Sequence, residues 1–419
     1  MFQAESEVID WIYSFRASKK ERRLDHLYEM LAKFDNPHQK LKTIHIAGTN
    51  GKGSTVAYMR EALMQAGYKV ATFTSPYIIC FGERISINNV PIHEVDLIKY
   101  ANLLKNSMSF TTLSYTSFDL ITLISFLYFS DATVDIAIYE TGIGGRLDST
   151  NVITPLATAI TNVGHDHADI LGETQLERAT EKLGIVKAGI PLFTTVEDSD
   201  LLVEFEKVCR EKNAELFCGL ELAQLKAIDS SGVTFCYGPY ESVKIKMHGQ
   251  HQFKNAVLAI SLLDYLKRAC GFKKIDPPQI ANATWQGRFE YVQWVPPVIL
   301  DGAHNLEGIQ ALVDTLEQVY PTKKKRFLFS AIATKDAQKM ITLLCEVAAH
   351  FTFTKGRHPD SIAPDVLSTF SNKVPSLAYD SYADAIDWAL DKLAADDVLV
   401  ICGSLYFISD GRKYLLEKK

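Results

Sequence analysis

The chain has 419 residues, of which 47% are hydrophobic and 22% charged, and its formal net charge is −6. This length exceeds one typical hydrophobic core and predicts two domains. The composition is that of ordinary globular proteins, and the acidic balance argues against nucleic acid as the main partner. The seven cysteines form no CxxC pair, which indicates neither a disulfide framework nor a zinc site and fits a reducing compartment.

The start of the chain does not resemble a targeting segment. Residues 1–15 carry acidic side chains early and lack the basic start and apolar core of a signal peptide. No run of the sequence approaches the roughly 20 apolar residues that a transmembrane helix needs. We therefore expect a cytoplasmic protein with no membrane partner.

Residues 42–67 (KTIHIAGTNGKGSTVAYMREALMQAG) carry a strand, a glycine-rich turn and a helix in immediate succession. Such a turn directs several backbone N–H groups at one point, next to the positive end of the helix dipole. This arrangement binds phosphate oxygens, and Lys52 adds a cation for the outer phosphates. The segment predicts a site for a nucleoside triphosphate with Mg²⁺. Its residues are Gly48, Thr49, Asn50, Gly51, Lys52, Gly53 and Ser54.

The elements around this turn also follow from the pattern. Apolar positions at helical spacing over residues 5–34 predict two helices before the first strand. Residues 68–73 predict a second strand, and residues 74–76 (TSP) break it at the carboxyl edge of the sheet, where ligands of α/β folds bind. Residues 81–92 predict two short strands around an Asn-Asn turn.

A buried parallel strand is predicted where the apolar run VDIAIYE ends in Glu140. A long helix over residues 117–129 precedes it. A carboxylate at such a strand end is typical of nucleotide enzymes, in which it holds Mg²⁺ opposite the phosphate loop. Strands and helices continue to alternate as far as residue 270. These are strands at 156–161 and 192–195, helices at 175–186, 199–212 and 252–270, and a β-rich passage at 232–243.

Proline pairs at 277–278 and 296–297 indicate a change of unit, which we place at residue 295. The predicted domains are residues 1–294 and 295–419. The second domain shows another α/β alternation. Its predicted strands are 298–300, 326–332, 351–354 and 397–402, and its predicted helices start near residues 306, 336, 364 and 384.

Several motifs taken together resemble one family. LKTIHIAGTNGKGST, VDIAIYETGIGGRLDSTNVI, GQHQFKNAVLAI, WQGRFE and ILDGAHN are similar, in order and spacing, to those of folylpolyglutamate and dihydrofolate synthases of the Mur ligase superfamily. The resemblance implies a P-loop domain with a mainly parallel sheet and a smaller Rossmann-like α/β domain. It also implies an ATP-dependent ligase: ATP phosphorylates a pterin-bearing carboxylate, and the amino group of L-glutamate attacks the acyl phosphate. A monomer is expected.

The resemblance also implies a metal site. Ser75 and Glu140 match the ligands of one Mg²⁺, and His167 matches the histidine ligand of a second. Lys182 corresponds to the lysine that many Mur-type ligases carbamylate, which turns a cation into an anion beside the metals. The expected catalytic residues are Lys52, Glu140, His167 and Lys182. His165 is expected to be structural.

For the nucleotide, the resemblance implies contacts from Asn255 to adenine, Arg288 to phosphate and Asp301 to ribose, with His304 in the same cleft. ATP would then contact both domains. For the pterin it implies Phe118, Asp119, Leu147, Asp148 and Ser149. This chain departs from the family pattern at two places, because Asp119 replaces a glutamate and Tyr77 replaces a histidine.

The sequence leaves the acceptor open. The chain can add the first glutamate to dihydropteroate, extend folates into polyglutamates, or do both. A Mur-type ligase acting on another carboxylate is a rival, disfavoured because the phosphate loop begins by residue 48 and leaves no room for a separate domain for a UDP-sugar. A non-catalytic nucleotide-binding regulator is another, disfavoured because it would not need Ser75, Glu140, His167 and Lys182 together.

Overall fold

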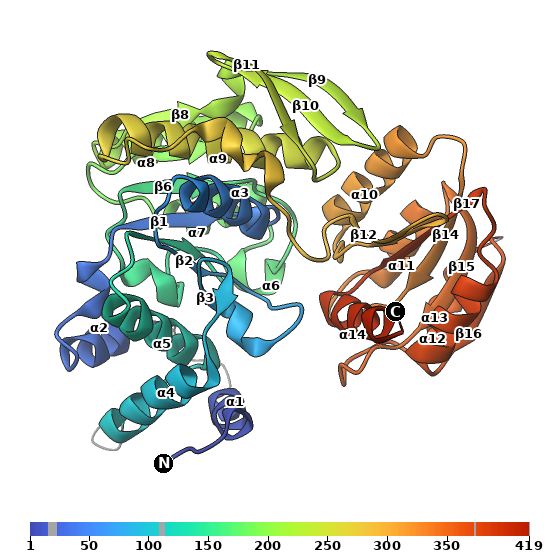
Figure 1. The fold of residues 1–419 in the computed structure, drawn as a ribbon, viewed down its shortest axis with the longest axis horizontal. Helices are drawn as coiled ribbons and strands as arrows, with labels where there is room; N and C mark the ends of the chain where they lie inside the picture. Colours follow the sequence, from blue (N-terminus) through green and yellow to red (C-terminus); the bar gives the residue numbers. More distant parts are fainter. Residues whose placement is uncertain (16–22, 109–113, 373, 419) are drawn as a thin grey trace. The chain divides into compact units, whose positions relative to one another are not determined.

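The computed structural model describes residues 1–15, 23–108, 114–372 and 374–418. It divides into two compact units (Figure 1), and each is described by itself. The first comprises residues 1–224, 237–241 and 254–283, and the second comprises residues 225–236, 242–253 and 284–419.

The first unit is built on an eight-stranded sheet of order β4-β3-β2-β5-β1-β6-β7-β8. Along this order, each neighbouring pair from β2 to β8 is parallel, whereas β3 is antiparallel to both of its neighbours, β2 and β4, at one edge. The central strands are buried on both faces, as their apolar sequences predict. The strands are β1 Thr43–Ala47, β2 Val70–Phe73, β3 Ile85–Ile87, β4 Val90–Pro91, β5 Ile136–Glu140, β6 Ala157–Ile160, β7 Leu192–Thr194 and β8 Leu216–Cys218.

Helices cover both faces of this sheet (Figure 1). α3 and α9 lie on one face, where Tyr265 of α9 packs on Phe193 of β7. The other face carries α1, α2, α4 and α5 over β2 and β5, and α7 and α8 over β6 and β7. The helices are α1 Glu5–Ser14, α2 Asp25–Ala32, α3 Lys52–Gln65, α4 Glu94–Met108, α5 Ser117–Asp131, α6 Ala168–Leu171, α7 Gln175–Leu183, α8 Ser199–Glu211 and α9 Gln250–Ala269.

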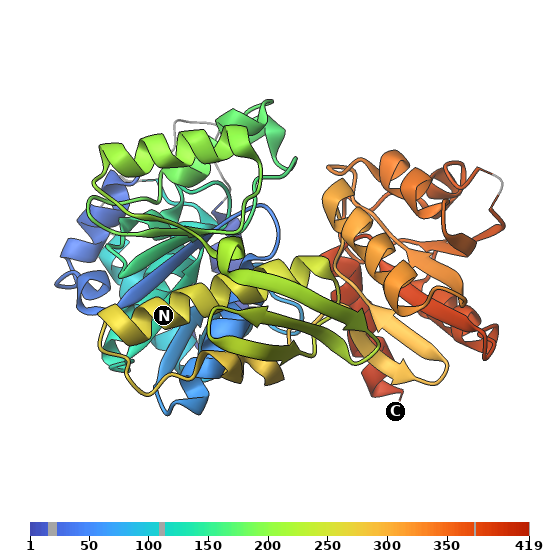
Figure 2. The same ribbon diagram turned by 90° about the horizontal axis from the view of Figure 1, so that it is seen from above.

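A separate three-stranded ribbon follows β8 in the chain (Figure 2). Its order is β11-β10-β9, and its residues are divided between the two units. The strands are β9 Ala223–Asp229, β10 Gly232–Tyr237 and β11 Tyr240–Ile245. β10 alternates buried and half-buried residues, so one face of the ribbon packs inward.

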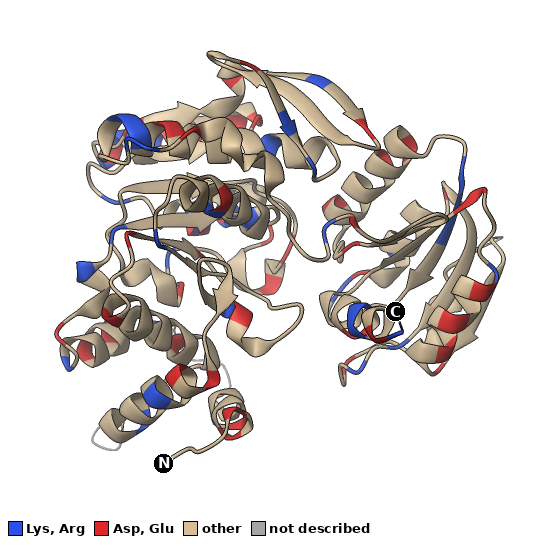
Figure 3. Ribbon diagram, viewed as in Figure 1, with Lys and Arg blue, Asp and Glu red and all other residues tan. Residues whose placement is uncertain are grey.

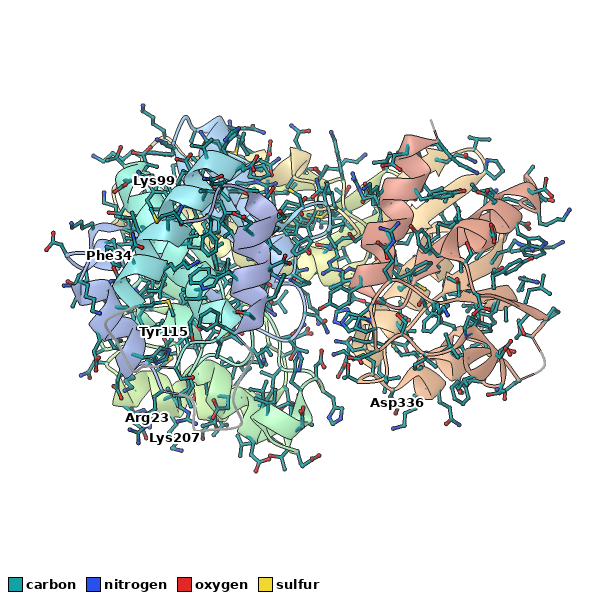
Figure 4. The ribbon with its side chains drawn as sticks, turned by 90° about the horizontal axis from the view of Figure 1, so that it is seen from below. Arg23, Phe34, Lys99, Tyr115, Lys207 and Asp336 are labelled. Atoms are coloured by element: carbon teal, nitrogen blue, oxygen red, sulfur yellow. The ribbon has the colours of Figure 1, made fainter. Side chains whose placement is uncertain are left out.

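The second unit holds a six-stranded sheet of order β12-β13-β17-β14-β15-β16, parallel except for β12. α10, α11 and α12 pack on one face, and α13 and α14 pack on the other. Asp336, labelled in Figure 4, caps α11 by accepting from Lys339 N–H. The elements are β12 Glu290–Trp294, β13 Pro297–Leu300, α10 Leu306–Val319, β14 Lys324–Phe329, α11 Ala337–Leu344, β15 Ala348–Thr354, α12 Pro364–Ser368, β16 Ser376–Tyr379, α13 Tyr382–Asp391, β17 Asp397–Cys402 and α14 Leu405–Glu417.

The predicted fold class, two α/β domains with mainly parallel sheets, is confirmed. Some element limits differ: the strand expected to reach Ile332 ends at Phe329, and Ile332 forms only an isolated bridge with Ser361. The chain enters the second unit for the last time after Ala283, before the boundary expected at residue 295, because β12 pairs with β13 in the second sheet. The domain limits stay a prediction.

Charged residues of both signs are interspersed over both units (Figure 3). Within the described residues, no helix has both the length and the apolar character needed to cross a membrane.

The first prediction concerns the core under α5. Leu123 is 1% exposed there, and Leu103 on α4 is 41% exposed. Leu123→Ala should lower the free energy of unfolding by roughly 2–5 kcal/mol, because a buried cavity replaces packed methyl groups. Urea unfolding followed by fluorescence measures this, with Leu103→Ala as the exposed control. Equal effects of the two substitutions would contradict the packing described.

Candidate functional site

The glycine-rich turn joins β1 to α3 at the carboxyl edge of the first sheet. Gly51 is the N-cap of α3 with φ 84°, a backbone conformation that side chains rarely adopt. A methyl group there would lie 2.2 Å from the amide oxygen of Asn255, so Asn255 packs directly against the turn. The first turn of an α-helix leaves N–H groups without intrahelical partners. The predicted turn residues and Asn255 are therefore brought together at a helix N-terminus suited to phosphate.

The loop after β6 holds this turn in shape. The side-chain oxygen of Asn162 accepts from Thr49 N–H (3.1 Å) and Asn50 N–H (2.9 Å), and Thr161 Oγ1 donates to Asn50 O (2.6 Å). Gly164 N–H donates to Thr49 Oγ1 (2.9 Å). Sequence reasoning missed Thr161 and Asn162, which lie more than a hundred positions from the turn and in no motif.

Lys52 lies between the turn and the end of β5. Its ammonium donates to Gly48 O (2.9 Å) and Thr49 O (3.2 Å) and lies 3.8 Å from Glu140 Oε1. Glu140 Oε2 accepts from Ser75 N–H (3.2 Å). The structure thus brings three predicted residues together, because β5 lies between β1 and β2 and all three strands end at one edge.

Glu140 and Ser75 fit a Mg²⁺ ion. Glu140 is 4% exposed, and its carboxylate, a hard oxygen donor, lies beside Lys52 of the phosphate turn and accepts from the backbone of Ser75, whose hydroxyl is a donor of the same kind. Mg²⁺ in nucleotide enzymes usually binds one or two carboxylates together with phosphate oxygens. Among the residues described, no cluster of three or more His, Cys, Asp or Glu is arranged to hold a metal ion.

Lys182, near the end of α7, is buried at 2% exposure. Burial, and after it the nearby Lys52 ammonium, lowers the pKa of Lys182 to about 7, with Asp166 opposing the shift. The amine is therefore largely neutral above pH 7. The position is not that of a solvated surface lysine.

The two histidines of the HDH motif lie on the loop after β6. His167 precedes α6 with φ 53°, and its ring lies 3.9 Å from the Asp166 carboxylate. Asp166 also acts on Lys182, so this loop is close to the end of α7. Arg178 of α7 confirms the proximity by donating to Gly164 O (2.8 Å). The metal role of His167 and the structural role of His165 stay predictions.

Phe118 and Leu147 are half-buried, and Phe118 lies against Gly142, where a methyl group would sit 2.8 Å from the ring. Asp119, in contrast, is 5% exposed. Burial acts to raise the pKa of Asp119, but hydrogen bonds from His26 (3.1 Å) and Ser149 (2.5 Å) outweigh it, so that the pKa lies below its usual value. Phe118 and Leu147 therefore retain free surface for a ligand, whereas both oxygens of Asp119 have partners within the protein.

His26 was not anticipated from the sequence, although it lies near the N-terminus of α2. Its backbone carbonyl accepts from the hydroxyl of Tyr115 (3.4 Å), which is labelled in Figure 4. The rings of the two residues pack edge to face at 5.2 Å. A lone histidine in a helix carries no signal that would single it out.

In the second unit, Arg288, Asp301 and His304 lie together. Asp301 accepts from Phe289 N–H and Ala303 N–H, both at 2.8 Å. Burial raises the pKa of Asp301, opposed by the Arg288 guanidinium. His304 Nδ1 donates to Gly302 O (2.7 Å), while Asn305 rather than His304 caps α10. The expectation that these residues and Asn255 contact one nucleotide involves residues of both units, and it stays a prediction.

A glycine-rich turn at a helix N-terminus, facing a lysine and a strand-end carboxylate, defines a nucleotide-dependent α/β enzyme. Residues 46–263 match the family model "Mur ligase middle domain", and residues 287–405 match "Mur ligase, glutamate ligase domain".

Relatives agree over the whole chain. The dihydrofolate synthase/folylpolyglutamate synthase of Bacillus subtilis is 39% identical over 433 residues, covering 99% of this chain and all of that protein. The structure of folylpolyglutamate synthase from Thermotoga maritima superposes with a TM-score of 0.86 at 28% identity, covering 99% and 97% of the two chains. That of Mycobacterium tuberculosis, complexed with ADP, gives 0.87 at 25% identity and 98% of each chain.

The chain therefore belongs to the Mur ligase family, in the group of dihydrofolate and folylpolyglutamate synthases, which confirms the resemblance seen in its motifs.

The low pKa of Lys182 leads to a prediction about stability. In the unfolded chain a lysine titrates near pH 10.5, whereas in the folded protein Lys182 loses its proton near pH 7. The destabilisation by Lys182 should therefore grow as the pH falls from 10.5 to about 7, by at most about 1.4 kcal/mol per pH unit, and then stay constant. Lys182→Met removes this effect.

Thermal melting in CO₂-free buffer measures it: the gain of Lys182→Met over the unsubstituted protein should be larger at pH 7 than at pH 10. Lys40→Met is the control, since Lys40 is exposed and paired with Asp35. A gain independent of pH would show that Lys182 has an ordinary pKa.

Proposed function

We propose that this protein is an ATP-dependent ligase that adds L-glutamate to a folate, to dihydropteroate, or to both, through an acyl-phosphate intermediate. The observation that carries the proposal is the position of Lys52, with its ammonium 3.8 Å from Glu140 Oε1 at the mouth of the phosphate turn. The family relationship over the full chain supports the substrate class. The small-molecule substrates are ATP, a pterin-bearing carboxylate and L-glutamate.

In the first step, an oxygen of the substrate carboxylate attacks the γ-phosphorus of ATP, and the bond to the ADP oxygen breaks. Two anions approach each other, so the barrier is largely electrostatic. Lys52 and the N–H groups at the start of α3 offset the charge on the transferred group. Glu140 and Ser75 would hold Mg²⁺, which supplies further charge neutralisation on the phosphates.

In the second step, the amino nitrogen of glutamate attacks the acyl carbon, the bond to phosphate breaks, and the nitrogen loses a proton. The product is an amide, with ADP and phosphate released. The half-buried ring of Phe118 and the methyl groups of Leu147 offer an apolar surface on which a pterin can stack. Asn255, Arg288, Asp301 and His304 are proposed to bind the nucleotide.

Lys182 is proposed to carry a carbamate. Its neutral amine, favoured by the pKa of about 7, attacks the carbon of CO₂ and loses one proton, which leaves a carboxylate on the nitrogen. The anion would orient the metal-binding groups, including His167. Its formation places an anion near the Lys52 ammonium, which is electrostatically favourable.

The proposed setting is the cytoplasm, and the proposed assembly is a monomer. These extend the composition and the family relationship and stay predictions. Which acceptor is used is decided by measuring ADP formation with dihydropteroate and with tetrahydrofolate, each with and without glutamate. ADP formation independent of both acceptor and glutamate would favour the nucleotide-binding regulator instead.

Removal of the Lys52 ammonium from the phosphate turn should abolish turnover. Lys52→Ala is expected to lower ligation at least 100-fold, because a preorganised charge that acts on the transferred phosphate contributes several kcal/mol. The fold should remain, since the Lys52 ammonium contacts the turn rather than a core. ADP release and the melting temperature are measured together, with Lys40→Ala as the exposed control. Near-normal turnover of Lys52→Ala would refute the assignment of the turn.

Substitution of Lys182 separates a carbamate from a structural amine. Lys182→Ala should lose activity, and formate or acetate should restore part of it by placing an anion in the vacated space. Removal of dissolved CO₂ should lower the activity of the unsubstituted enzyme, and bicarbonate should restore it. Full activity of Lys182→Ala would remove Lys182 from the site.

A further inference from the structure

A buried chain of hydrogen bonds joins the centre of β1 to the turn that follows Glu140. His45 and Thr150 are both 0% exposed, and His45 Nε2 lies 2.8 Å from Thr150 Oγ1. The Thr150 hydroxyl donates to Asp148 Oδ1 (2.5 Å). A hydroxyl has only one hydrogen, so Thr150 must accept from His45, which fixes the imidazole as the Nε2–H tautomer. Burial, and after it Lys187, lowers the pKa of His45 to about 3, consistent with a neutral ring.

The other oxygen of Asp148 holds the turn itself. Asp148 Oδ2 accepts from Gly142 N–H (2.9 Å) and Ile143 N–H (3.0 Å), the second and third residues after Glu140. Since Asp148 is 4% exposed and both of its oxygens have partners within the protein, its side chain fixes the backbone that leaves β5.

Asp148 is the N-cap of a short 3₁₀ helix, η3 Ser149–Val152, whose residues bond to other parts of the site. Ser149 donates to Asp119 at the start of α5, the helix that carries Phe118. The Asn151 amide donates to Arg146 O and to Gly184 O, both at 3.0 Å. Gly184 directly follows α7, which carries Lys182. η3 is therefore bonded to β1, to the turn after Glu140, to α5 and to the end of α7.

The turn after Glu140 also lies directly on α7. A methyl group at Gly145 would sit 2.8 Å from the carbonyl oxygens of Glu181 and Lys182, and Arg146 N–H donates to Glu181 O (2.7 Å). Any shift of this turn therefore moves the backbone beside Lys182 as well as the backbone beside Glu140.

From this network we propose that His45 is a positioning residue, and that the relay through Thr150 and Asp148 holds Glu140 and Lys182 in their working geometry. The inference rests on the proposed function for the roles of these two residues. It assigns Asp148 and Ser149 to positioning within the protein, in place of the direct substrate contact expected from the motif.

The physical reason is that a buried polar relay is costly unless every member is bonded. His45 occupies a strand position between Ile44 and Ile46, where an apolar residue would pack at no such cost. His45 Nδ1 finds no hydrogen-bond partner among the described residues, so the hydrogen bond of this ring is the one that Nε2 makes with Thr150. A site that must be accurate to a fraction of an ångström depends on such supporting bonds.

The test uses Thr150→Val, which keeps the shape of the side chain and removes the relay, with Thr150→Ser as the conservative variant that keeps the hydroxyl. Thr158→Val is the matched control, because Thr158 is equally buried and donates to Pro191 O (3.0 Å) outside the relay. His45→Leu and His45→Gln form a second pair, since the glutamine amide can replace the donated hydrogen. Three quantities are measured: the melting temperature, kcat and KM for each substrate, and calorimetric binding of a non-hydrolysable ATP analogue as Mg²⁺ is varied.

We expect Thr150→Val and His45→Leu to lower kcat, or the Mg²⁺-dependent part of analogue binding, by about 10–100-fold, as loss of outer supporting bonds does at metal sites. The KM for the folate should stay unchanged, and Thr150→Ser and His45→Gln should recover most of the loss. Thr158→Val should lower only the melting temperature.

Equal losses of melting temperature in Thr150→Val and Thr158→Val, with normal kcat and Mg²⁺ dependence, would overturn the proposal. So would a rise in folate KM alone, which would indicate direct substrate contact by this segment. If the variants do not fold, Asp148→Asn, which changes the last member of the relay at nearly constant size, provides the comparison with Thr158→Val. Failure of the unsubstituted protein to ligate glutamate would instead refute the proposed function, and analogue binding would still test the relay.

Discussion

The site in the first unit depends on the electrostatic attraction between the Lys52 ammonium and the Glu140 carboxylate. Both side chains are largely buried, at 12% and 6% exposure, yet their charged atoms are 3.8 Å apart and do not form a close hydrogen bond. Each charge has other partners, which are backbone carbonyls of the turn for Lys52 and Ser75 N–H for Glu140. The two charges therefore attract each other without forming a close ion pair, so both can turn to a phosphate or a metal ion.

The strand order explains why Lys52 and Glu140 lie close together. β5, β1 and β6 are neighbours in the sheet, so the ends of three strands meet at one edge. β1 supplies the phosphate turn, β5 supplies Glu140, and the loop after β6 supplies Asn162, which holds the turn. Long sequence separations are thereby reduced to distances between adjacent strands, which is the usual advantage of a parallel sheet for ligand sites.

Most of the architecture was predictable from the sequence, because it depends on local patterns. The apolar run ending in Glu140 and the glycines around Lys52 each specify one strand end or turn, and the structure brings them together as expected. The helix α4 was not predicted. Its buried apolar residues are few, Leu97, Tyr100, Ala101 and Leu104 on one face, and they belong to the core that α1 and α5 also form.

The missed parts of the site are side-chain partners rather than motifs. His26 reaches Asp119 across 93 positions, and His45 reaches Thr150 across 105. No local pattern encodes such pairs, because the bond depends on how β1, α2 and α5 are packed. The motif LDSTN likewise gives no sign of the partners that Asp148 and Ser149 have within the protein, and their contact with a substrate stays a prediction.

The register of β1 has a further consequence. His45 lies opposite Tyr139 and Ile46 opposite Glu140 in the pairing with β5, so successive residues serve opposite faces of the sheet. A displacement of β1 by one residue would exchange these faces, placing the imidazole beneath α3 and an isoleucine against η3. One-residue insertions or deletions within β1 should therefore be among the least tolerated changes in the chain, whereas length changes in the β9–β10 turn would leave this pairing untouched. For engineering, the first unit can be varied in length at its surface connections but not along this central strand.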